Sequence, residues 1–154
     1  MAALNFPDSP SADQVHTENG KSWVWDGVSW ISSIAISEVF IIPASDELTD
    51  LEVGDGKATF RTPYALTLVT IKASVTTAPA GSTIIVDITE GGVTILSTLL
   101  TIDAGEKTST TAAVPVVVSD NVLADDAEIQ INIDQVGSST TGTGLKIILE
   151  GYKS

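Results

Sequence analysis

From residue 57 onward, apolar and polar residues alternate with a period of two, which is the pattern of strands with one buried face. The clearest segments are "YALTLVTIKASV", "STIIVDITE", "VTILSTLLTI", "VPVVVS", "AEIQINIDQV" and "LKIILEGYKS". Turn signals rich in Gly, Pro or Asp separate them, such as Gly91–Gly92 after the second segment. Together with "KATFRT" they predict seven or eight strands and no helix of useful length.

Short strands at this spacing are typical of an all-β protein built as a two-sheet antiparallel β-sandwich or a barrel. We expect a sandwich of jelly-roll type, with an immunoglobulin-like sandwich as the alternative. "DAGEKTSTT" leaves room for a short strand near Lys107–Thr111. Within "YALTLVTIKASV", strict alternation puts one set of side chains on the same face, namely Leu66, Leu68, Thr70 and Lys72.

A second pattern lies near the N-terminus, in "TENGKSWVWDGVSW". Asn-Gly at 19–20 and Asp-Gly at 26–27 are strong signals for two-residue hairpin turns. They predict a three-stranded meander of Gln14–Glu18, Lys21–Trp25 and Val28–Ser32. In this register His16 faces Trp23, and Trp23 faces Trp30. One face then carries His16, Trp23, Trp25, Val28 and Trp30, and the other carries Val15, Thr17, Ser22, Val24 and Ser29.

The segments around the meander divide the chain into two parts. Phe6, Pro7 and Pro10 read as an extended arm that leads into the first strand, because Pro fixes φ and biases its predecessor toward extended conformations. After the meander, "IAISEVFIIP" predicts an apolar strand that ends at Pro43, and an acidic loop follows. We therefore expect an N-terminal arm and meander at 1–36 and a β-sandwich at 37–154.

All three tryptophans of the 154-residue chain lie on the predicted aromatic face. Three such rings offer roughly 450–750 Å² of surface, which is as much as the largest patch that a soluble monomer normally exposes. A free three-stranded ribbon is also marginal in water. This face must therefore be covered, either by the rest of the same chain or by another chain. In the second case the meander is an anchor or a trimer-forming collar.

Composition narrows the range of partners. Acidic residues outnumber basic ones by 20 to 7, and the formal net charge is −13. With so few basic side chains to replace phosphate counterions, nucleic-acid binding is not expected. There are no cysteines, no apolar run long enough for a membrane helix and no signal-peptide pattern at the start, so we predict neither a thiolate metal site nor a membrane partner.

Catalytic chemistry has little support in the residues. The only histidine, His16, lies beside Trp23 in the meander, where a packing or interface role is expected. Carboxylates are clustered in loops such as "DELTDLE", which are typical of solvated surface. A calcium site at Asp125, Asp126 and Glu128 matches no ordered ligand spacing. The sequence therefore predicts a non-enzymatic structural or binding protein with no cofactor and no metal.

"FPDSPSADQVHTENGKSWVWDGVSW" resembles a short segment that recurs in structural proteins of tailed bacteriophages, including head fibres, tail fibres and decoration proteins. The segment from "FRTPYALTLVTIKASV" to "LKIILEG" is similar to a jelly-roll domain common in phage virion proteins. The two resemblances imply a virion component located on the capsid surface or a tail appendage.

Within that class, the absence of heptads and the short chain favour a capsid decoration (cement) protein or a short appendage over a long fibre. The resemblance implies a homo-oligomer, most simply a trimer, that contacts a major capsid, tail or collar protein. The expected interface residues are Phe6, His16, Trp23, Trp25, Val28 and Trp30. The alternatives are a tail-fibre protein that recognises host glycans, which has few aromatic residues to support it, and a small hydrolase, which is weaker still.

Overall fold

The computed structural model describes residues 5–12, 14–19, 21–32 and 37–153. The chain divides into two compact units, Met1–Ile36 and Ser37–Ser154. Gly20 of the predicted first turn and positions 34–36 of the predicted strand before Pro43 lie outside the described residues. Apart from one 3-10 turn at Ser109–Thr111, the described elements are all strands, so the all-β prediction is confirmed.

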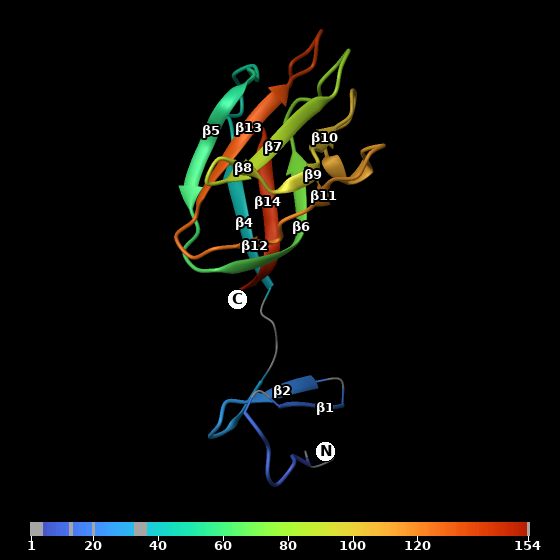
Figure 1. The fold of residues 1–154 in the computed structure, drawn as a ribbon. Helices are drawn as coiled ribbons and strands as arrows, with labels where there is room; N and C mark the ends of the chain where they lie inside the picture. The colour runs from blue at the N-terminus through green and yellow to red at the C-terminus, as the bar shows by residue number, and fades with distance from the viewer. Residues whose placement is uncertain (1–4, 13, 20, 33–36, 154) are drawn as a thin grey trace. The chain divides into compact units, whose positions relative to one another are not determined.

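The N-terminal unit is a three-stranded antiparallel meander in the order β1-β2-β3, as predicted (Figure 1). Its strands are β1 (Val15–Glu18), β2 (Lys21–Trp25) and β3 (Trp30–Ser32). The first hairpin has the predicted register, with His16 opposite Trp23 and Glu18 opposite Lys21. Asn19 has a φ of 52°, the positive value that a two-residue hairpin turn needs there.

The larger unit holds two main antiparallel sheets, one with strands in the order β10-β7-β13-β5 and one in the order β12-β6-β14-β4 (Figure 1). A short strand β8 pairs with β7, and β11 pairs with β9. The strands are β4 (Ser37–Pro43), β5 (Gly54–Arg61), β6 (Leu66–Ser74), β7 (Ile84–Glu90), β8 (Val93–Thr94), β9 (Leu96–Thr98), β10 (Leu100–Ile102), β11 (Val117–Val118), β12 (Val122–Leu123), β13 (Glu128–Gln135) and β14 (Lys146–Lys153).

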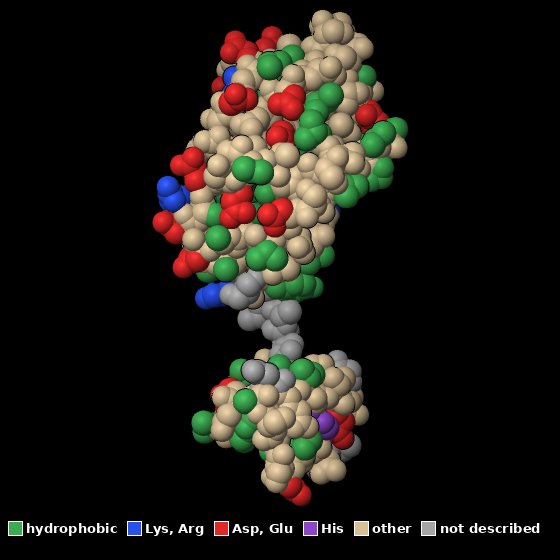
Figure 2. Space-filling model, viewed as in Figure 1, with side chains coloured by type: hydrophobic (Ala, Val, Ile, Leu, Met, Phe, Trp, Pro, Cys, Tyr) green, Lys and Arg blue, Asp and Glu red, His purple; other side chains and the backbone are tan. Residues whose placement is uncertain are grey.

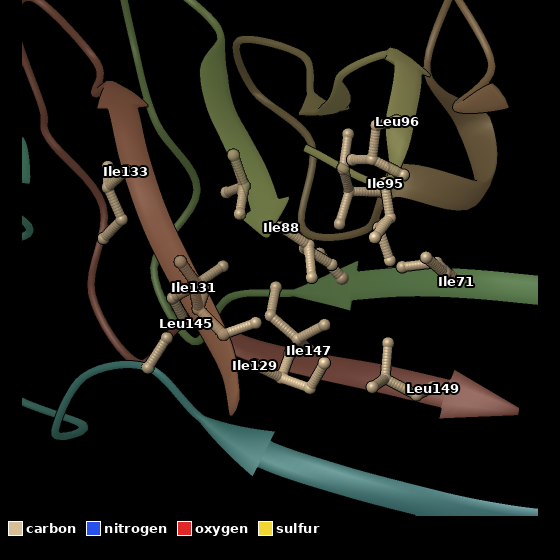
Figure 3. Close-up of a cluster of buried hydrophobic side chains, with 14 of the residues drawn as sticks. Ile71, Ile88, Ile95, Leu96, Ile129, Ile131, Ile133, Leu145, Ile147 and Leu149 are labelled. Carbon is tan, nitrogen blue, oxygen red and sulfur yellow. The ribbon is translucent and has the colours of Figure 1, made fainter. Parts of the chain in front are cut away.

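One aliphatic core fills the space between these sheets (Figure 3). Alternate residues of β13 point into it, and Ile129, Ile131 and Ile133 are at most 1% exposed. Ile147 and Leu149 of β14 face them from the other sheet and are equally buried. The period-two pattern of the sequence therefore predicted this core correctly, because each strand sends every second side chain inward.

Strand β6 departs from the predicted alternation. Leu66 and Leu68 are buried together with Ile71 and Ala73, whereas strict alternation placed the two pairs on opposite faces. The pairing with β14 shifts between Glu150 and Gly151, so Val69 is an extra residue that reverses the parity of the strand. The backbones approach closely here, since a Cβ at Gly151 would lie 2.3 Å from the Thr67 carbonyl oxygen. Only glycine fits opposite this bulge.

Two further segments also differ from the prediction. "VTILSTLLTI" is divided into β8, β9 and β10 and is not one strand. The Thr94 hydroxyl accepts the Leu96 N–H (3.1 Å) and donates to Asp87 (2.5 Å), which bends the chain between β8 and β9. Near Lys107–Thr111, where the sequence left room for a short strand, the chain forms one isolated β-bridge from Thr108 to Ser74 and then the 3-10 turn. The Thr108 side chain caps this turn by accepting the Thr110 N–H.

The outer face of the β10-β7-β13-β5 sheet carries acidic side chains (Figure 2). The Asp134 side chain is exposed, but some loss of hydration raises the pKa of its carboxyl, and the nearby carboxylates of Asp87 and Asp55 raise it further. A carboxyl pKa that is higher in the folded state than in the unfolded state means that ionisation costs stability above that pKa. The cost disappears as the pH falls through it.

We therefore expect Asp134→Asn to raise the melting temperature at about pH 7 by one or two degrees, since solvent screens most of the repulsion. The gain should shrink as the pH falls through the Asp134 pKa. Thermal melts followed by circular dichroism at several pH values measure it. Asp125→Asn removes the same charge from another exposed residue, one that does not belong to this carboxylate cluster, and is the control. An equal gain from both substitutions would mean that net charge, rather than this carboxylate cluster, is responsible.

Candidate interaction site in the N-terminal unit

The N-terminal unit is organised around a cluster of five aromatic rings. Trp23, in the central strand, is its most buried member at 9% exposure. The Phe6 ring lies 5.2 Å from the Trp23 ring, edge to face, and stacks on the Trp30 ring at 5.3 Å. The His16 ring is 6.2 Å from Trp23, and Trp25 is 5.6 Å from Trp30. Edge-to-face and stacked pairs at these distances are favourable beyond their burial.

The arm that carries Phe6 is held against the meander by polar contacts. The Asn5 N–H donates to Glu18 Oε2 at 2.9 Å. Further along, Gln14 accepts the Ser11 N–H through its side chain, and its carbonyl accepts the Trp25 N–H. Phe6 thereby covers much of the tryptophan face from within the same chain. Of the two alternatives for covering that face, coverage by the same chain applies at least to Trp23, while Trp25 and Trp30 are only partly buried.

His16 contributes its imidazole ring to the aromatic cluster. Its Nε2 is buried and has no hydrogen-bond partner among the described residues, and the nearest carboxylate oxygen, Glu18 Oε2, is 3.5 Å away. Phe6 and Trp30 lie 5.2 Å and 5.8 Å from the imidazole ring. The described residues therefore place His16 in ring packing against its aromatic neighbours.

The second hairpin departs from the predicted register. Val28 was expected on the aromatic face and Trp23 opposite Trp30, and both predictions are wrong, since Trp23 lies opposite Ser32. Trp25 pairs with Trp30, and Val28 lies in a four-residue loop with 84% exposure. The Asp26 carboxylate accepts the backbone N–H groups of Val28 (2.8 Å) and Ser29 (2.7 Å), which widens the turn. Both hydrogen bonds lower the pKa of the Asp26 carboxyl, and the bond from the Ser29 N–H has the larger effect. The register moves by two residues, so the tryptophans stay on one face.

The opposite face of the meander is uncharged and carries a row of aliphatic side chains beside the hydroxyls of Thr17 and Ser22. Val15 pairs with Val24, and Val24 pairs with Ile31, so three branched side chains form a row across the strands. Val15 is 60% exposed and Ile31 is 50% exposed. The sequence pattern had placed Val15 and Val24 on this face. The row was missed because Ile31 joins it only in the register that the longer loop produces.

Two of the residues weighed for a metal site lie beside a basic side chain. Arg61 lies 3.5 Å from the Asp126 carboxylate and 3.7 Å from that of Glu128, two of the three residues considered for calcium. No group of three or more potential metal ligands is found in the described part of the chain. Within the same residues, no helix has the length and apolar character to cross a membrane.

Comparison of the chain with protein family models, with curated proteins and with solved structures found no match.

Proposed function

We propose that this protein is a non-enzymatic structural component of a bacteriophage virion, a capsid decoration protein or short appendage that attaches through its N-terminal unit. The observation that carries the proposal is the difference between the side chains of the two units. The larger unit has its own aliphatic core, whereas the smaller one concentrates all three tryptophans in a meander. The resemblance of "FPDSP…NG…WVWDG…W" to phage virion proteins points in the same direction.

The order of strands supports a jelly roll as the architecture of the larger unit. β4, β14, β6 and β12 form one sheet, and β5, β13, β7 and β10 form the other. Strands that follow each other in sequence, such as β4 and β5 or β6 and β7, lie in different sheets. This is the alternation expected when two Greek keys wrap into a double sheet, an architecture used in viral capsid domains.

Within the N-terminal unit, we assign attachment to the part of the aromatic cluster that remains accessible. Trp25 and Trp30 are partly buried and keep some exposed surface, and Val28 projects from the loop between them. Phe6, His16 and Trp23 form the interior that holds these residues in place. The uncharged row of Val15, Val24 and Ile31 suits contact with further copies of an acidic chain. The proposed homo-oligomer, for which the resemblance implies a trimer, would use this row as a contact between subunits.

The experiment is to locate the protein on intact particles by cryo-electron microscopy, with a C-terminal tag as a marker. We expect density on the capsid surface or at the base of an appendage, with the N-terminal unit against the particle. Density at the distal tip of a tail fibre, together with binding to host glycans, would favour the receptor-binding alternative. Absence from purified particles would overturn the proposal.

A further inference from the structure

Strand β4 forms an unprotected edge of its sheet. Among the described residues it pairs only with β14, in antiparallel register from Tyr152 opposite Ser37 to Lys146 opposite Pro43. The Ala44 N–H, just beyond the strand, donates to the Leu145 carbonyl at 2.8 Å. The backbone N–H and C=O groups of successive residues alternate between the two sides of a strand, so those of Ile42 and Phe40 also point toward β14. Those of Ser37, Val39 and Ile41 therefore point toward the open edge.

The outward-facing side chains at this edge are uncharged, and apart from Ser37 they are apolar. Val39 is 54% exposed and Ile41 is 63% exposed on the outer side of the sheet. Glu38 points the other way and is hydrogen-bonded to the Tyr64 phenol. Edge strands are usually protected by charged side chains, bulges or prolines. Here only Pro43 serves in that way, at the end of the strand, where it has no N–H to leave unpaired.

We propose that this edge pairs with the β4 edge of a second copy of the chain, in antiparallel register about a two-fold axis at Val39. In that register Val39 faces Val39 of the other copy, and Ser37 faces Ile41. Each of these pairs exchanges two backbone hydrogen bonds, about six in all. Pro43 falls outside the paired segment. Two four-stranded sheets then join into one continuous sheet.

Charge favours a second copy at this face. The chain carries a formal charge of −13, so two copies repel over most of their surface. The outer side of the sheet next to β4 is balanced, however. Lys72 lies 3.3 Å from Glu150 of β14, and Lys146 pairs with Glu47. Two copies can therefore meet here without repulsion between two negatively charged surfaces. The contact goes beyond the proposed function and, on a particle, would link neighbouring copies.

Single cysteines test this register, since the natural chain has none. In the full-length chain, Val39→Cys places two thiols on directly opposite residues, with Cα atoms about 5.5 Å apart, within reach of a disulfide. Ile41→Cys places them four residues out of register, roughly 13 Å apart along the strand. We expect Val39→Cys to form disulfide-linked dimers at least about tenfold faster than Ile41→Cys in a glutathione buffer.

Leu48→Cys, at a position that is 91% exposed in a loop, measures the rate of random collision. Adding Ile41→Pro to Val39→Cys removes one edge N–H without affecting the ladder to β14, and it should reduce cross-linking to that background rate. Circular dichroism confirms that each variant is folded. The proposal is overturned if Val39→Cys links no faster than Leu48→Cys, if Ile41→Cys links faster, or if the proline has no effect. Incorporation of the unmodified chain into particles tests the proposed function separately.

Discussion

Replacing Trp23 with alanine should unfold the N-terminal unit and leave the larger unit folded. The Trp23 ring is buried and contacts both Phe6 and His16, so its removal leaves a cavity at the centre of the cluster. Truncating a buried tryptophan costs about 3–5 kcal/mol. A three-stranded unit of this size has less stability than that to lose. Two-dimensional NMR should show collapsed amide dispersion for the meander and unchanged signals for the sandwich.

If the proposed function is correct, the same variant is excluded from particles. Val28→Ala is the matched control, because Val28 is 84% exposed and its truncation leaves no cavity. We expect that variant to keep a folded meander and at most to weaken attachment. A Trp23→Ala protein with a dispersed meander spectrum and normal incorporation would contradict both the structural and the functional role of the cluster.

Removal of the N-terminal unit should separate folding from attachment. A chain that begins at Ser37 retains the whole aliphatic core, which draws its buried side chains from β4 onward. We expect it to be soluble and cooperative in thermal unfolding, with incorporation into particles falling below detection. Circular dichroism and quantitative immunoblotting of purified particles provide the two measurements.

The control for this truncation is competition. An excess of the Ser37–Ser154 chain should leave the incorporation of the full-length protein unchanged, since it lacks the attachment surface. Incorporation of the truncated chain at the level of the full-length protein would place the attachment site in the sandwich. The meander would then have only a structural role.

Alternation predicted most of the sandwich because the inward and outward parity of a strand is a local property. The alternation in "AEIQINIDQV" located the buried isoleucines of β13, Ile129, Ile131 and Ile133, without knowledge of the topology. Alternation failed at Val69, where one extra residue reversed the parity of β6. That bulge depends on the close approach of Gly151, which is 82 positions away in the sequence (151 − 69). No local signal predicts a contact of this kind.

The candidate site could be predicted from the sequence to a similar extent. The first turn gave the correct pairing of His16 with Trp23, because a two-residue turn leaves one register available. The second turn was extended by hydrogen bonds to the Asp26 side chain, so Trp25 lies opposite Trp30 and not opposite Val28. That Phe6 covers Trp23 was not predictable, since the arm is held by a contact between Asn5 and Glu18 across the meander.

The confinement of all three tryptophans to the meander also has a practical consequence for spectroscopy. Fluorescence excited at the red edge of the indole absorption band reports on the smaller unit alone. Far-ultraviolet circular dichroism is dominated by the larger unit, which holds most of the strands. One denaturant titration followed by both signals therefore yields a separate unfolding curve for each unit in the intact chain. Two midpoints that differ would measure how independently the units fold.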